Sequence, residues 1–239
     1  MERLDKLLAN TGRWSRKEAR ELVKRGRVVA DGVVATAFDA KYSPEAVILV
    51  DGEALSHGKK TYIMLHKPAG VLSATEDKRQ KTVLDLLPAH LQKLGLFPVG
   101  RLDKDTEGLL LLTDDGPLAH ELLSPKKHVD KVYFVRTEGV LEEHDVRAFA
   151  EGMVLGDGLV CQSAGLEILD PPDTAFVTLR EGKFHQIKRM LAARGKPVLY
   201  LKRLSMGGLK LDERLEKGEW RYLEEREVDL LWSKSTKKC

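Results

Sequence analysis

Cysteine is scarce in this sequence, with only Cys161 and Cys239 among 239 residues. So few thiols exclude a disulfide framework and are typical of a reducing cytoplasm. Neither cysteine lies beside a pair of histidines, and the seven histidines are scattered without the spacing of metal ligands. We therefore expect no metal site.

Long apolar runs are missing as well. The run from Leu109 to Leu112 is far too short to cross a bilayer. The N-terminal segment MERLDKLLAN is charged and lacks the apolar core of a signal peptide. We therefore expect a cytoplasmic protein with no membrane partner.

The net charge of the whole chain is only +3, but the charge is unevenly distributed. Residues 13–27 hold seven basic and two acidic side chains, a local excess of +5. Such an excess is typical of a segment that contacts a polyanion. A solvated helix face without a ligand is the alternative, and the shortage of balancing acidic residues disfavours it.

Residues 1–58 are predicted to form a small domain of their own. A short helix over RLDKLLAN is followed by a second, basic helix that begins at a capping box of Ser15 and Glu18 and ends at Gly26. A hairpin with Asp31-Gly32 at its turn follows, and AVILVDGEAL supplies another strand. The polar stretch SHGKK, residues 56–60, is predicted to be a linker.

Residues 59–239 show strands and helices in an irregular order without a βαβ rhythm. Strands are predicted at YIMLHKP, GVLSATE, KVYFVRTEG and TAFVTLREG, and helices at EEHDVRAFAEG and KFHQIKRMLAARG. This order favours the α+β class, with a mixed, largely antiparallel sheet flanked by helices. The tail SKSTKKC is expected to be disordered.

The segment GRLDKDTEG, residues 100–108, places five charged side chains between apolar stretches. A plain turn is the simplest explanation, because Asp and Gly are turn residues. A calcium loop is a second, since Asp103, Asp105, Glu107 and Asp114 fall at ligand positions of such a loop. However, Leu111 stands where a polar ligand is usual, and the flanks have the pattern of strands.

A catalytic carboxylate is the third explanation. A carboxylate that stays ionised in an apolar site needs a cationic partner. The helix KFHQIKRM offers Lys188 and Arg189, of which one can reach into a pocket while the other faces out. Tyr133 lies on an alternating strand, opposite to Val132 and Phe134. These segments lie far apart in the sequence, so spacing alone leaves the three explanations open.

Four segments in order, HKPAGVLS, PVGRLDKDTEGLLLLTDDG, KVYFV and EGKFHQIKRML, resemble the motifs of pseudouridine synthases. The resemblance is strongest to the small-subunit ribosomal RNA pseudouridine synthase A group. The N-terminal segments RLDKLL, SRKEARELVKRGRV and VDG resemble the S4 RNA-binding domain. The resemblance implies an enzyme that isomerises a specific uridine of 16S ribosomal RNA. It detaches uracil N1 from ribose C1′ and rejoins the base through C5, with no cofactor.

The resemblance also implies roles for individual residues. Asp103 matches the essential carboxylate, Lys188 the basic residue that pairs with it, and Tyr133 the tyrosine that stacks on the target base. Arg101 is expected to contact RNA, and Leu201 to form part of an apolar floor under uracil.

Three neighbours of these positions are expected to have no part in the reaction. Asp105 and Glu107 would be turn or surface residues. His185 would be structural, with its ring bonded to the backbone.

In the N-terminal domain, the resemblance implies phosphate contacts by Arg16, Lys17, Arg20 and Lys24. The expected partner of a monomeric protein is therefore ribosomal RNA, either the small-subunit RNA itself or an assembly intermediate. Two alternatives stay open. One is a synthase acting on large-subunit (23S) ribosomal RNA, and the other is a non-catalytic ribosome-assembly protein that keeps the fold.

Overall fold

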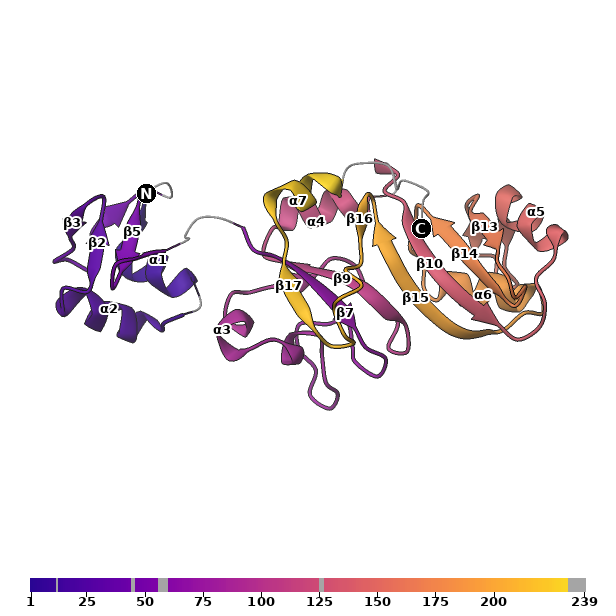
Figure 1. The fold of residues 1–239 in the computed structure, drawn as a ribbon, viewed down its shortest axis with the longest axis horizontal. Helices are drawn as coiled ribbons and strands as arrows, with labels where there is room; N and C mark the ends of the chain where they lie inside the picture. Colours follow the sequence, from indigo (N-terminus) through magenta and orange to yellow (C-terminus); the bar gives the residue numbers. More distant parts are fainter. Residues whose placement is uncertain (12, 44–45, 56–59, 125–126, 232–239) are drawn as a thin grey trace. The chain divides into compact units, whose positions relative to one another are not determined.

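The computed structural model describes residues 1–11, 13–43, 46–55, 60–124 and 127–231 (Figure 1). Its contacts divide the chain into two units. The first comprises Met1–Thr61 with Leu87–Leu96, and the second comprises Tyr62–Leu86 with Phe97–Cys239. Most of the expected linker and the whole expected disordered tail lie outside the described residues.

The first unit begins with β1 (Glu2–Arg3), which pairs with β4 (Lys41–Tyr42), and continues with α1 (Leu4–Asn10) and α2 (Arg16–Lys24). The predicted capping box is confirmed at the start of α2. The Ser15 hydroxyl accepts a hydrogen bond from the Glu18 amide at 3.3 Å, and the Glu18 carboxylate accepts one from the Ser15 amide at 2.6 Å. Helix α2 is therefore fixed at its N-terminus by its own sequence.

A four-stranded antiparallel sheet completes this unit, in the order β3 (Val33–Val34), β2 (Val28–Ala30), β5 (Ile48–Val50), β6 (Glu53–Leu55). Both residues of the predicted Asp31-Gly32 turn have positive φ, at 50° and 82°, as a tight hairpin requires. A second turn of the same kind, Asp51-Gly52, divides AVILVDGEAL into two strands where the sequence predicted one.

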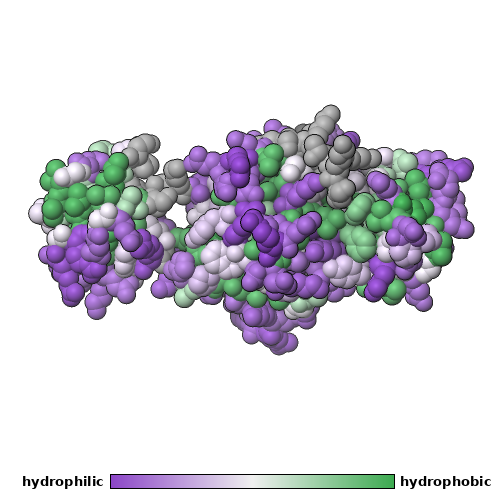
Figure 2. All heavy atoms as spheres, in the orientation of Figure 1, coloured by the Kyte–Doolittle hydropathy of each residue, from purple (hydrophilic) through white to green (hydrophobic). Residues whose placement is uncertain are grey.

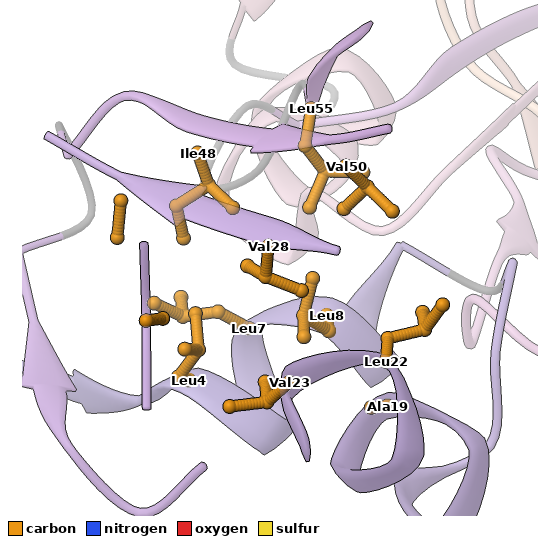
Figure 3. Close-up of a cluster of buried hydrophobic side chains, with 12 residues drawn as sticks. Leu4, Leu7, Leu8, Ala19, Leu22, Val23, Val28, Ile48, Val50 and Leu55 are labelled. Atoms are coloured by element: carbon orange, nitrogen blue, oxygen red, sulfur yellow. The ribbon is translucent and has the colours of Figure 1, made fainter. Parts of the chain in front are cut away.

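The core of the first unit lies between the two helices and the sheet (Figure 3). It is formed by the apolar faces of both helices and by alternate residues of the strands, namely Leu4, Leu7, Leu8, Ala19, Leu22, Val23, Val28, Ile48, Val50 and Leu55. Because α2 turns its apolar face to this core, its charged face is left to solvent, and Figure 2 shows a hydrophilic surface over α2.

The second unit is built on a nine-stranded sheet. The main order is β13 (Gly165–Ile168), β14 (Thr174–Leu179), β10 (Lys131–Thr137), β15 (Val198–Met206), β9 (Glu107–Thr113), β7 (Tyr62–Lys67), β17 (Trp220–Tyr222). Two short strands join it, β16 (Leu209–Lys210) beside β15 and β8 (Phe97–Pro98) beside β9. A separate two-stranded ribbon pairs β11 (Met153–Val154) with β12 (Val160–Cys161).

Beyond Thr61, the described residues include the helices η1 (Leu84–Leu86), α3 (Ala89–Gln92), α4 (Gly116–Leu123), α5 (Glu143–Glu151), α6 (Gln186–Ala193) and α7 (Glu225–Leu230). The expected α+β class with a mixed, largely antiparallel sheet is confirmed, although GVLSATE forms only an isolated bridge between Leu72 and Thr82. Among the described residues, no helix is long and apolar enough to span a membrane.

Two groups of antiparallel strands meet where β9 runs parallel to β15, and this parallel pairing is short. Glu107 lies opposite Lys202, and Gly108 lies opposite Arg203. Gly108 has a φ of 104°, and a Cβ atom there would lie 2.2 Å from the carbonyl oxygen of Arg203. Only glycine fits this junction, so the last residue of GRLDKDTEG fixes the segment against the middle of the sheet.

Candidate active site

A pocket in the second unit opens beside this junction. It holds about 420 Å³, including the part that is open to solvent. Its walls come from the loop before β9, from β10, β14 and β15, and from α6 with the loop before it. Among its lining residues are five that the sequence singled out: Arg101, Asp103, Tyr133, Lys188 and Leu201. Segments that lie up to a hundred residues apart in the sequence therefore meet at one place.

The carboxylate of Asp103 forms an ion pair with Lys188, whose Nζ lies 3.1 Å from Asp103 Oδ2. Both side chains are largely shielded from solvent, with 23% of Asp103 and 22% of Lys188 exposed. The same ammonium group also contacts Asp105 Oδ1 at 2.5 Å. Burial opposes the charge of Lys188, but hydrogen bonds to Asp105 and Asp103 outweigh it and raise the pKa of Lys188 above its usual value.

Arg189 is turned away from this pair and forms an ion pair with Asp157 at 2.5 Å. The expectation that one of the two adjacent cations reaches into a pocket while the other faces out is therefore confirmed. Asp105 is 72% exposed, as expected for a turn residue, although its contact with Lys188 was not foreseen.

The apolar part of the pocket comes from the sheet, from α6 and from the loop before β9. Tyr133 on β10 is only 8% exposed, and Leu201 on β15 is buried on the same face of the sheet. Leu102, Leu179 and Ile187 complete this part of the lining. Val132 and Phe134 lie on the opposite face, as the alternation predicted.

The contacts of His185 differ from the expected ones. It precedes α6 with a left-handed backbone, φ 51°, and lines the pocket. Its Nε2 lies 3.6 Å from Asp103 Oδ1, and its ring stacks on Phe184 with ring centres 3.8 Å apart. The expected bond from its ring to the backbone is not present among the described contacts. The predicted backbone bond was wrong, because the ring faces a carboxylate from a loop some eighty residues away.

Glu107 is not a surface residue, which corrects a second expectation. It begins β9 and is 9% exposed, with Lys217 Nζ at 2.9 Å and the Tyr200 hydroxyl donating to it at 2.7 Å. Burial and the Glu107 carboxylate together raise the pKa of Tyr200 to about 12. The calcium-loop explanation is wrong too, since the seven-residue strand β9 separates Glu107 from Asp114 by roughly 20 Å.

The segment HKPAGVLS supports the loop that carries Asp103 through hydrogen bonds to the loop backbone. Lys67 is fully buried and donates hydrogen bonds to the carbonyl oxygens of Pro68, Lys104 and Thr106 at 2.9–3.2 Å. The Ser73 hydroxyl donates to the Leu102 carbonyl at 2.8 Å and accepts from the Leu102 amide. No role was predicted for Lys67 or Ser73, and their place in HKPAGVLS, one of the segments that resemble family motifs, was the only signal in the sequence.

The buried position of Lys67 predicts a pH dependence. Burial lowers the pKa of Lys67 from 10.5 to about 8. A neutral amine has two protons to donate, one fewer than the three carbonyls accept. We expect turnover to fall as pH rises through about 8, because the loop loses one support. The free energy of unfolding should rise over the same range, since the unfolded chain then binds more protons than the fold.

A pH–rate profile of wild type and two variants measures this effect. The pKa of Lys131, likewise buried, is lowered to about 8, so Lys131→Met is the matched control and should keep the alkaline decrease. Lys67→Met should turn over slowly and show no decrease near pH 8. A wild-type profile in Lys67→Met would contradict the assignment to Lys67.

The basic residues of α2 fall into two classes. Arg16 and Lys17 are exposed and have no acidic partner within the described residues. Lys24 forms an ion pair with Glu21 at 3.1 Å. Arg20 is half-buried and pairs at 3.0 Å with Asp5, which is 1% exposed. Arg20 therefore also holds α2 to α1, a contact that was not predicted from the sequence.

Comparisons with known proteins agree with this architecture. The sequence matches the family model of RNA pseudouridylate synthases over residues 61–193 and that of S4 domains over residues 2–42. An uncharacterized RNA pseudouridine synthase of Bacillus subtilis is 48% identical over 96% of this chain and 98% of its own length. The ribosomal small subunit pseudouridine synthase A of Vibrio cholerae is 40% identical over 96% of this chain and 99% of its own length.

A crystal structure of a pseudouridylate synthase is similar to this chain with a TM-score of 0.69 and 37% identity, over 97% of this chain and 100% of that one. The predicted enzyme class and the predicted S4 domain are thereby confirmed. A family match over more than half of the chain, with full-length relatives at 40% identity or above, shows that this chain belongs to the RNA pseudouridine synthase family.

Proposed function

We propose that this protein converts a specific uridine of 16S ribosomal RNA to pseudouridine in the cytoplasm, acting as a monomer on the RNA or on an assembly intermediate. The observation that carries the proposal is the ion pair between Asp103 and Lys188 in a pocket whose lining is partly apolar. The choice of 16S RNA is supported by relatives named ribosomal small subunit pseudouridine synthase A, at 40% identity over nearly the whole chain.

Asp103 is the catalytic carboxylate in this proposal and enables uracil N1 to leave ribose C1′ before C5 takes its place. A carboxylate in such a site works only as an anion, and the ammonium of Lys188 at 3.1 Å is the counter-charge that holds it there. The buried ring of Tyr133 stacks on the uracil, and Leu201 closes the pocket beneath the base.

The arrangement of two domains follows from the cost of reaching the target. A uridine inside a stack must be everted before C1′ and C5 are accessible, at a cost of a few kcal/mol. In the proposal, residues 1–58 bind the RNA backbone and so offset that cost, while residues 59–239 hold the everted nucleoside. Arg101, which is exposed at the pocket and has no acidic partner in the described part of the chain, contacts the backbone beside it.

Mapping pseudouridines in the ribosomal RNA of a deletion strain tests the substrate. We expect one 16S pseudouridine to disappear and to return when the wild-type gene is supplied. Loss of a 23S pseudouridine instead would show that the large subunit is the substrate. An unchanged map of both RNAs would favour the non-catalytic assembly protein.

The role of α2 predicts a change in salt dependence. Reversing Arg16 and Lys17 to Glu should weaken RNA binding and make the slope of log affinity against log salt shallower by about 1.5, because two phosphate contacts are lost. Arg20 is left in place because it pairs with Asp5. Filter binding of 16S transcript across a salt series measures the slope.

The control reverses Arg147 and Lys127, exposed basic residues of the second unit, and so changes the net charge equally. It should bind with the wild-type slope. Equal slopes for the two double variants would show that α2 does not contact phosphates.

A further inference from the structure

One large aromatic side chain stands exposed at the edge of the pocket. Phe184 is 71% exposed, although the residues on both sides of it, Lys183 and His185, line the pocket. Single exposed apolar residues are common on protein surfaces, so exposure alone carries no meaning. The contacts of the Phe184 ring, in contrast, indicate a function for its exposure.

The ring of Phe184 is supported on one face. It stacks on His185 with ring centres 3.8 Å apart and planes inclined by 17°, and His185 Nε2 lies 3.6 Å from Asp103 Oδ1. A continuous line of contacts therefore runs from an exposed aromatic face to the proposed catalytic carboxylate. Within the described parts of the chain, no second ring stacks on Phe184, so its other face can receive a flat ring.

The loop that carries Phe184 is fixed on both sides. Gln186 accepts a hydrogen bond from the Lys183 amide at 3.1 Å and donates one to the buried Glu181 carboxylate at 2.6 Å. Glu181 also accepts from the Gln162 amide at 2.9 Å. This network holds the backbone, and the ring is presented to solvent by ordered structure.

A flat, exposed and fixed ring is the surface on which unpaired bases stack in RNA-binding proteins. When one nucleotide is everted, the base beside it loses a stacking partner. We propose that Phe184 is the stacking platform for a base that flanks the everted uridine, and so positions the RNA for entry into the pocket. This inference rests on the proposed function, because it needs an RNA with an everted uridine.

Turnover of a 16S transcript labelled with tritium at uridine C5 tests the proposal. Phe184→Tyr and Phe184→Trp keep an aromatic face, so kcat/KM should stay within about threefold of wild type. Phe184→Leu keeps the apolar bulk but loses the face, and Phe184→Ala loses both. The Leu and Ala variants should each raise KM about tenfold or more and change kcat little, because the RNA is then bound without the stacked base.

Two further measurements separate this role from a structural one. The midpoint of thermal unfolding should be unchanged in all four variants, because the side chain is largely exposed. Leu199→Ala, which truncates another exposed apolar residue of the same unit, should have wild-type kinetics. Equal kinetics for Phe184→Leu and Phe184→Tyr, or a loss confined to kcat with reduced stability, would overturn the proposal.

Measurements on the wild-type protein separate a wrong substrate from a wrong role for Phe184. Tritium release from a 23S transcript and not from 16S would refute the proposed substrate. The four variants would then be measured on the 23S transcript, and their KM values would still decide the role of Phe184.

Discussion

Asp103→Asn is expected to lower turnover by roughly a thousandfold or more, because a neutral amide can act neither as a nucleophile nor as a base. RNA affinity should change little, since the S4 domain and the proposed RNA contact at Arg101 are untouched. The amide preserves the size of the side chain, and Lys188 keeps Asp105 as a partner. Tritium release from uridine C5 under single-turnover conditions measures the loss, and filter binding measures the affinity.

Asp105→Asn is the matched control for this prediction. Both carboxylates contact the same ammonium group, but Asp105 is 72% exposed and does not line the pocket. Its amide variant should keep activity within about tenfold of wild type, a loss small enough to reflect a weakened ion pair rather than lost chemistry. If both variants were equally inactive, the catalytic role would belong to the loop as a charged unit and not to Asp103.

Gly108→Ala is expected to destabilise the second unit by roughly 3 to 5 kcal/mol, because the new methyl group has no room and the backbone conformation disfavours it. The added Cβ would lie 2.2 Å, 2.6 Å and 2.9 Å from three backbone atoms of Arg203. The parallel pairing of β9 with β15 would have to open. Urea unfolding with an unchanged m-value measures the loss in free energy.

Gly218→Ala separates the two causes of the expected loss in stability, which are the steric collision and the backbone strain. Gly218 has a similar φ of 94°, but nothing lies within 4 Å of a Cβ atom placed there. This variant carries the backbone strain without the collision and should lose about 1 to 2 kcal/mol. Equal losses at the two positions would show that β15 moves aside easily and that the junction is not tightly packed.

Local features of the fold were predictable because their causes are local. The capping box of Ser15 and Glu18 and the turn at Asp31-Gly32 involve residues within a few positions of each other, and both formed as predicted. The alternation around Tyr133 gave the correct buried face of β10. In each case the residues that decide the structure stand next to one another in the sequence.

The site itself was located by resemblance, and the errors arose where a distant segment supplies the partner. Glu107 is charged and follows a turn, which favoured exposure, yet Lys217 and Tyr200 enclose it. His185 was assigned to the backbone, yet it faces Asp103. Arg20 was expected to contact phosphate, and its ion pair with Asp5 was not foreseen. Spacing along one segment carries no information about such long-range pairs.

The parallel pairing of Gly108 with Arg203 has a consequence for the order of synthesis. The first unit is built mainly from Met1–Thr61, and these residues leave the ribosome before α6 and β15, which supply walls of the pocket. A nascent chain therefore contains the S4 domain before its pocket is complete. A polypeptide that ends before Val198 would bind RNA without converting uridine.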